Sequence, residues 1–207
     1  MEDLRDWIAI LEAEGELSRV RAKVDWRGEL AEVQRLVAKS QGPAVLYENI
    51  QDYEQGRCTK VFCGGTATQK RTALMLGLPK DASRSEIVAE LRRCFRNPVK
   101  PVVVETGSVK ENILRGDDVG LFDFPVPQWH TDDKGRYINT WCGTMTKDPD
   151  TGRNNVGVYR GSIATRNTLN VLLVPAQNWG VNFSKYQALG QPMPVAFAYG
   201  WHPAMIF

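Results

Sequence analysis

Several features that mark particular protein classes are absent from this chain of 207 residues. No apolar run approaches the ~20 residues that a membrane helix needs, which predicts a protein without a membrane span. The formal net charge is only +2 and no basic run carries interleaved aromatic residues, so we expect no nucleic-acid partner. The charged stretch at residues 1–6 is unlike a signal peptide, which predicts a cytoplasmic location.

Cysteine and histidine are scarce and scattered. The cysteines are Cys58, Cys63, Cys94 and Cys142. They form no C-x-x-C pair and no cluster with histidine, so we expect reduced, partly buried thiols. The histidines, His130 and His202, lie far apart and give a Ser-His-Asp hydrolase no support. We interpret His130 as a loop residue bonded to neighbouring carboxylates, and His202 as part of an Xaa-Pro turn.

Nucleotide-binding signatures are also missing, because no G-x-G-x-x-G run follows a strand and no Walker lysine is present. Gly64-Gly65-Thr66 precedes a predicted helix and could cradle a phosphate, but a tight strand-to-helix turn explains it more simply. Trp129, Trp141 and Trp179 are candidates for the walls of an aromatic pocket, or for core and interface residues.

The first half of the chain alternates between helix and strand patterns. Apolar periodicity, caps and glycine stops predict helices over 4–11, 30–37, 68–76 and 83–97. Ser83 and Glu86 have the spacing of a capping box. Strands are predicted over 17–24, 44–47 and 61–63. This alternation predicts an α/β domain over residues 1–100.

The second half, residues 101–207, is dominated by strands. Turn signals at 148–152 and 166–168 separate strands over 137–147, 155–165 and 169–174, which predicts an antiparallel meander. A short helix over 183–189 and a last strand over 195–199 follow. Pro203, followed by apolar residues, then predicts the start of a helix at the end of the chain. A meander by itself would leave an uncovered sheet edge, so we expect this chain to be the N-terminal part of a longer protein.

The most informative run is Asn155-Val156-Gly157-Val158-Tyr159-Arg160. Asn155 offers an amide oxygen for a metal or hydrogen bond, and Arg160 offers a rigid fork of donors for phosphate or carboxylate. Side chains at odd separations point to opposite faces of a strand, so the two share a ligand only if the strand bends. A hairpin with one exposed arginine is the alternative.

These residues, with others in order along the chain, carry a resemblance to a known family. The matching segments are Asn97-Pro98 with Val102-Val103-Val104, Leu121-Phe122-Asp123-Phe124-Pro125-Val126-Pro127, His130 with Asp132-Asp133, Gly135-Arg136-Tyr137-Ile138, Asp148-Pro149 with Thr151-Gly152, and the run from Asn155 to Arg160. The chain resembles the UbiD family of reversible aromatic and α,β-unsaturated acid decarboxylases, and the likeness covers its whole length.

The resemblance implies an α+β protein, with an N-terminal α/β domain followed by part of a split β-barrel of the flavin-reductase type. It implies decarboxylation of an aromatic or α,β-unsaturated carboxylic acid with prenylated FMN and a divalent metal. Manganese is the expected metal, with potassium as a further candidate ion. A homo-oligomer or a complementary C-terminal subunit is the implied assembly.

The same resemblance implies roles for individual residues. Asn155 takes the place of a metal ligand, while Gly157, Val158 and Tyr159 would run beside the flavin. Arg160 takes the place of the catalytic arginine that contacts both cofactor and substrate carboxylate.

Two departures from the family pattern limit this assignment. Gln177 takes a cofactor-contacting position, but Asn178 stands where family members carry a second metal ligand, a histidine. An amide oxygen suits a hard ion such as manganese but binds more weakly than imidazole. The family's third metal ligand and catalytic glutamates have no match among these residues. The alternatives are therefore a non-catalytic or split subunit that binds a partner, and a plain FMN-binding redox module.

Overall fold

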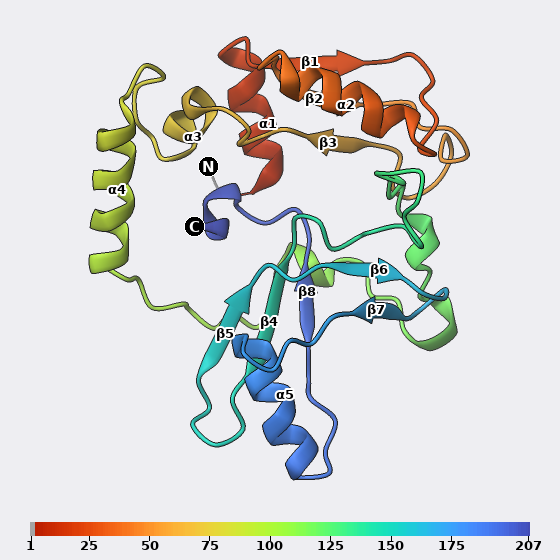
Figure 1. The fold of residues 1–207 in the computed structure, drawn as a ribbon, viewed down its shortest axis with the longest axis vertical. Helices are drawn as coiled ribbons and strands as arrows, with labels where there is room; N and C mark the ends of the chain where they lie inside the picture. The colour runs from red at the N-terminus through yellow and green to blue at the C-terminus, as the bar shows by residue number, and fades with distance from the viewer. Residues whose placement is uncertain (1–2) are drawn as a thin grey trace.

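The computed structural model describes residues 3–207, so Met1 and Glu2 of the charged N-terminal stretch lie outside the described residues. The helices are α1 (Leu4–Ala13), α2 (Glu29–Lys39), α3 (Gln69–Met75), α4 (Arg84–Arg96) and α5 (Asn178–Ala188). The strands are β1 (Leu17–Val20), β2 (Ala44–Tyr47), β3 (Val61–Cys63), β4 (Gly143–Lys147), β5 (Asn154–Gly157), β6 (Gly161–Ile163), β7 (Leu169–Val171) and β8 (Ala196–Ala198). This mixture of helices and small sheets confirms the α+β class (Figure 1).

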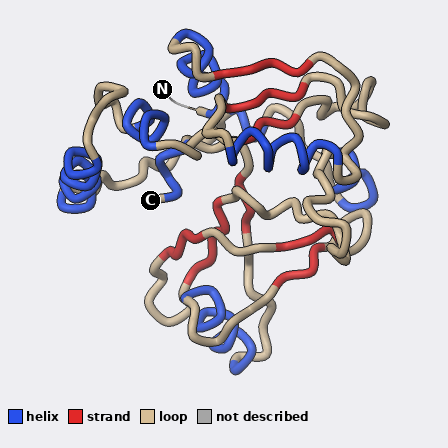
Figure 2. Tube along the Cα trace, turned by 45° about the horizontal axis from the view of Figure 1, so that its top comes forward, coloured by secondary structure: helices blue, strands red, loops and turns tan. Residues whose placement is uncertain are grey.

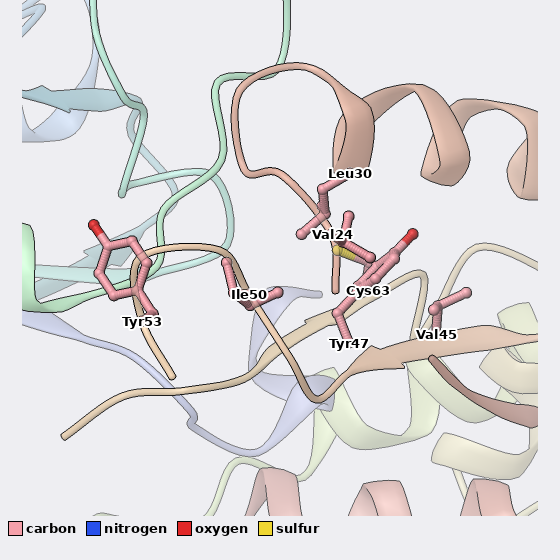
Figure 3. Packing of buried hydrophobic residues seen from close by; sticks show 7 residues of the cluster. All are labelled: Val24, Leu30, Val45, Tyr47, Ile50, Tyr53 and Cys63. Carbon is pink, nitrogen blue, oxygen red and sulfur yellow. The ribbon is translucent and has the colours of Figure 1, made fainter. Parts of the chain in front are cut away.

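The N-terminal half is a three-stranded sheet in the order β1-β2-β3, with β1 parallel and β3 antiparallel to β2. The central strand β2 is buried along its whole length because its side chains are covered on both faces. Val45 and Tyr47 pack with Leu30 of α2 on one face, whereas Ala44 packs with Trp7 of α1 on the other. Figure 3 shows Leu30, Val24, Tyr47 and Cys63 converging in the first of these clusters.

Local signals predicted this half well. The side chains of Asp3 and Thr68 cap α1 and α3, and Ser83 with Glu86 forms the predicted capping box of α4. The predicted strand over 17–24 is too long, because β1 ends at Val20 where its partner β2 ends at Tyr47. All four cysteines are free thiols, and burial raises the pKa of the Cys63 thiol to about 12, as expected for an inert core cysteine.

The C-terminal half corrects the predicted meander. β4 lies between β5 and β8 in one antiparallel sheet, whereas β6 pairs only with β7 in a second sheet. The predicted single strand over 155–165 is therefore wrong, because residues 158–160 break it into β5 and β6. The predicted helix over 183–189 also begins earlier, at Asn178. Figure 2 shows the strands of the C-terminal half set apart from the N-terminal sheet.

Val102-Val103-Val104, a run of β-forming residues that carries part of the family resemblance, has no regular secondary structure. Val103 is 97% exposed, and no strand of the described chain pairs with it. The β-forming character of three valines is thus unused in this structure, because a strand requires a partner for its backbone groups.

The two halves meet at two places (Figure 1). Near the chain ends, the backbone N–H of Leu4 donates to the carbonyl of Gly200 at 3.3 Å. At the other side, the N–H of Gln128 donates to the Trp26 carbonyl, and the Tyr53 hydroxyl donates to the Phe122 carbonyl, each at 2.9 Å. Within residues 3–207, no helix has the length and apolar character required to cross a membrane. The cytoplasmic location stays a prediction.

A buried ion pair ties α3 to the start of β1. Arg71 is only 2% exposed, and its guanidinium donates to Glu16 at 3.1 Å and to the carbonyl of Gly42 at 3.0 Å. Burial alone would raise the pKa of Glu16, but hydrogen bonds and charge from Lys70 and Arg71 outweigh it and lower this pKa. The pair therefore contributes stability that is present at neutral pH and is lost as pH falls through the lowered pKa.

Replacing Glu16 with glutamine should reduce the free energy of unfolding by roughly 3–5 kcal/mol, because the buried charge of Arg71 loses its partner. Urea denaturation at pH 7 measures this change. Glu14→Gln is the matched control, since Glu14 pairs with Lys80 on the surface and should cost less than about 1 kcal/mol. Equal effects of the two substitutions would contradict the role given to the buried pair.

Candidate functional site

The break between β5 and β6 separates two sets of side chains. Tyr159 folds back over Gly157, where an added Cβ would lie 2.7 Å from the tyrosine ring. Val158 and Arg160, in contrast, line a cavity on which Tyr159 does not border. The strand therefore bends after Gly157, as a ligand shared by Asn155 and Arg160 would require. The bend, however, places Tyr159 and Arg160 in different surroundings. Glycine at position 157 leaves room for the Tyr159 ring. The place of Gly157 beside a flavin stays a prediction.

Asn155 lies half-buried in β5. Its amide nitrogen donates to the hydroxyls of Thr146 and Tyr159, each at 3.4 Å. The amide nitrogen of buried Asn182 donates to the same Thr146 hydroxyl at 2.9 Å. Both bonds of Asn155 use its nitrogen, so Oδ1 has no hydrogen-bond partner within residues 3–207 and is available as a hard oxygen ligand.

Helix α5 is fixed over β4 and β5 by side chains spaced three residues apart. Trp179 stacks on Tyr159 with ring centroids 4.2 Å apart and an interplanar angle of 5°. Asn182 contacts Thr146 in the middle of the helix. Near its end, Lys185 donates to Asp148 at 2.8 Å and thereby lowers the pKa of that carboxyl. The predicted turn at 148–152 therefore also anchors the helix.

Gln177 and Asn178 lie at the start of α5, exposed to solvent. Gln177 is the N-cap residue but makes no capping hydrogen bond with its side chain, and the first turn carries no acidic residue. No side chain therefore caps the backbone N–H groups of this turn. The Trp179–Tyr159 stack joins this helix start to the end of β5, and the Tyr159 hydroxyl accepts from the amide of Asn155.

Arg160 belongs to a separate cavity of about 650 Å³. The cavity is lined by Trp129, His130, Asp133, Tyr137, Asn139, Thr140, Val158 and Arg160. The Arg160 guanidinium has no ion pair or hydrogen bond with any described residue, so its full fork of donors can receive a carboxylate. The amide nitrogen of buried Asn139 also lacks a partner among residues 3–207, while its oxygen accepts from the Tyr199 hydroxyl.

The remaining candidates have structural explanations. The backbone N–H of His130, not its imidazole, donates to Asp133, and His130 also lines the Arg160 cavity. His202 accepts from the N–H of Ala204 and caps a short 3-10 turn over Pro203–Ile206, and burial lowers its pKa. Gly64-Gly65-Thr66 forms the tight turn before α3. Across residues 3–207, no group of three or more His, Cys, Asp or Glu side chains could hold a metal ion.

Sequence reasoning missed Thr146, Asn182 and Asn139. A buried polar residue in a strand or helix gives no periodic signal of its own. Asn182 was the easiest of the three to predict from the sequence, because it lies one helical turn after Asn178 in an otherwise apolar stretch.

Comparison with known proteins gives this arrangement a family. The model of the 3-octaprenyl-4-hydroxybenzoate carboxy-lyase Rift-related domain matches residues 100–207. The model of the N-terminal domain of the same carboxy-lyase matches residues 8–91. The chain belongs to the UbiD family.

Individual UbiD relatives match nearly all of this chain. A pyrrole-2-carboxylic acid decarboxylase from Pseudomonas aeruginosa is 34% identical over 99% of this chain and 42% of its own length. The closed-form structure of the vanillic acid decarboxylase from Sedimentibacter hydroxybenzoicus superposes with a TM-score of 0.90 at 31% identity, covering 98% of this chain and 44% of that one.

The UbiD-class enzyme HmfF from Pelotomaculum thermopropionicum, solved in complex with FMN, superposes with a TM-score of 0.85 at 29% identity. The match covers 98% of this chain and 43% of the HmfF chain. An evolved dimeric form of HmfF has been solved in complex with prFMN. The chain spans less than half the length of each of these relatives.

Gly157→Ala should destabilise the fold by about 1–3 kcal/mol, because the new Cβ would push the Tyr159 ring off Trp179. Near-ultraviolet circular dichroism should show the altered stacking, and urea denaturation the loss of stability. Gly107→Ala is the matched control, since its extended backbone and open surroundings predict a change below about 0.5 kcal/mol. An unchanged aromatic signal in Gly157→Ala would show that the glycine does not set the stack.

Proposed function

We propose that this chain is the cofactor-binding and carboxylate-binding part of a UbiD decarboxylase that acts on an aromatic or α,β-unsaturated carboxylic acid. The observation that carries the proposal is the unpaired guanidinium of Arg160 in a cavity with aromatic walls. Such a site binds a carboxylate through two parallel hydrogen bonds while the ring packs against Trp129 and Tyr137. The named decarboxylase relatives support the same reaction class.

The proposed cofactor is prenylated FMN with a divalent metal, manganese first and potassium as an additional ion. Asn155, through its free Oδ1, and Asn178, exposed at the start of α5, would be the metal ligands of this chain. Gln177 and the open first turn of α5 would hold the phosphate end, with Gly157, Val158 and Tyr159 alongside the flavin. Prenylated FMN supplies the electron-accepting centre for loss of carbon dioxide.

We further propose the domain division at residue 100 and the assignment of residues 101–207 to part of a split β-barrel. The two family models, which meet between residues 91 and 100, support the division. The unjoined β5-β4-β8 and β6-β7 sheets are compatible with a barrel that lacks some of its strands. A plain FMN-binding redox module remains the rival, and the visible spectrum of extracted cofactor separates FMN from its prenylated form.

Arg160→Ala should lower decarboxylation by the assembled, cofactor-loaded enzyme by about 100- to 1,000-fold, as is typical when one preorganised electrostatic contact is lost. The assay follows carbon dioxide release from a panel of aromatic acids. Arg166→Ala in the exposed turn between β6 and β7 is the control and should retain activity, with the unfolding midpoint unchanged in both variants. Full activity of Arg160→Ala would refute the assignment.

A specific observation also favours the split-subunit alternative, in which a complementary C-terminal subunit supplies the missing glutamates. Residues 99–114 carry apolar side chains with unusually high exposure: Val99, Val102, Val103, Val104, Val109, Ile113 and Leu114. A stretch of this kind marks an interaction site. Extended backbone rich in valine is suited to pairing with a strand from the part of the UbiD fold that this chain does not span.

Val103→Asp should therefore abolish association with a C-terminal UbiD polypeptide without unfolding the chain, since Val103 is 97% exposed. The test is purification of the tagged chain from its native host, with partners identified by peptide mass spectrometry. Val88→Asp, at a 46% exposed position on α4, is the control and should retain the partner. An intact mass above 23.2 kDa for the untagged protein from the native host would instead mean that the segment packs within one longer chain. A partner retained by Val103→Asp would contradict the proposed surface.

A further inference from the structure

Arg136 adjoins a residue of the Arg160 cavity but has no role in the function proposed above. It belongs to the run Gly135-Arg136-Tyr137-Ile138, which carries part of the family resemblance. Its neighbour Tyr137 lines the cavity, whereas Arg136 is not among the described residues that do so. Any contribution of Arg136 to the site therefore acts through the segments that its side chain and its backbone hold.

The guanidinium of Arg136 holds the loop that leads into one wall of the cavity. Its Nε donates to the carbonyl of Val126 at 2.7 Å, and Nη2 donates to the carbonyl of Phe124 at 3.0 Å. One rigid fork of donors thereby fixes two carbonyls of the same loop. Trp129, three residues after Val126, lines the cavity. The fork therefore fixes the chain just before the wall that Trp129 forms.

The backbone of Arg136 is attached to β6, the strand that begins immediately after Arg160. The carbonyl of Arg136 accepts from the N–H of Ile163 at 2.9 Å. Three residues later, the N–H of Asn139 donates to the carbonyl of Gly161 at 3.1 Å. The segment that carries the second wall of the cavity is therefore tied to the strand that follows Arg160.

The same guanidinium packs on aromatic rings from both halves of the molecule. Its Cζ lies 4.1 Å from the centroid of the Trp26 ring and 5.4 Å from that of Tyr53, both in the N-terminal half. The Phe122 ring, in the C-terminal half, lies at 5.9 Å. No described carboxylate forms an ion pair with Arg136, so ring faces and carbonyl oxygens stabilise its charge.

Arg27 provides a comparison within the same structure. Its Cζ also lies 4.1 Å from the centroid of the Trp26 ring. Its guanidinium, however, donates to Asp25 at 3.3 Å and to Asp52 at 2.9 Å, both in the N-terminal half. Two guanidiniums thus pack on one indole, but only the side chain of Arg136 connects that indole to the loop of the C-terminal half.

We propose that Arg136 is a positioning residue that couples the walls of the Arg160 cavity to Trp26 in the N-terminal half. It holds the loop before Trp129 and the segment after Tyr137 in one arrangement relative to β6. The inference rests on the proposed function, because the walls matter to catalysis only if an aromatic carboxylate binds at Arg160. Such walls contact the ring equally in the bound substrate and in the transition state, so their displacement should raise KM more than it lowers kcat.

Arg136→Lys keeps the charge but loses both the fork and the planar stacking face. In the assembled, cofactor-loaded enzyme it should raise KM for aromatic acids by about three- to tenfold, the range for weakened ring packing, and leave kcat within about twofold. Arg27→Lys is the matched control and should change neither constant. A purely structural role for Arg136 would instead reduce the amount of folded enzyme, which lowers the apparent kcat and leaves KM unchanged.

Trp26→Phe keeps the test valid if Arg136→Lys fails to fold. This variant leaves the fork intact but offers the guanidinium a weaker ring face, so KM should rise in the same direction by a smaller factor. An unchanged KM in Arg136→Lys, or an equal rise in Arg27→Lys, would overturn the inference.

Hydrogen–deuterium exchange separates failure of this inference from failure of the proposed function, because it requires no turnover. Arg136→Lys should speed backbone exchange over residues 124–133 by about two- to tenfold and leave α4 unchanged, while Arg27→Lys should change neither region. If Arg160→Ala retained full activity, the proposed function would fail, and faster exchange in Arg136→Lys alone would still support the positioning role. Unchanged exchange over residues 124–133 would refute it.

Discussion

The geometry of the candidate site depends on the stacking of Tyr159 against Trp179. Stacking at 4.2 Å requires the tyrosine ring to turn back over Gly157, and a side chain at that position would block it. The strand consequently ends, and the residues on either side of Tyr159 face another way. One packing contact thus positions α5 over Asn155 and directs Arg160 into its own cavity.

The contact between the two halves of the molecule follows a different principle. The halves touch through backbone hydrogen bonds near Leu4 and near Gln128, and the space between these contacts is lined by large aromatic rings. Rings of this size fill space poorly unless their shapes match. Here glycines at positions 65 and 143 let the indoles approach, but their N–H groups remain without partners. The interface therefore combines closely packed rings with buried N–H groups that have no partner among the described residues.

The exposed apolar segment around Val103 has no pairing strand among the described residues. Relatives extend to more than twice the length that this chain matches, and strands in such folds pair with segments distant in sequence. Valine-rich backbone without a pairing strand remains extended and exposed, whatever its propensity. The two small sheets of the C-terminal half have edge strands, β5, β8, β6 and β7, that lack a second partner strand among the described residues.

The sequence by itself determined what local chemistry controls: the caps at Asp3, Thr68 and Ser83, the turn at 148–152, the buried strand β2, and the family motif around Asn155. Tertiary structure decided what depends on distant partners. The break after Gly157 required the Trp179 ring, and the early start of α5 required the close approach of Gly180 to the Val174 carbonyl. No strand forms at Val103, because no described segment pairs with its backbone. Periodicity records which faces are apolar, but the partner of each face is fixed only when the chain packs.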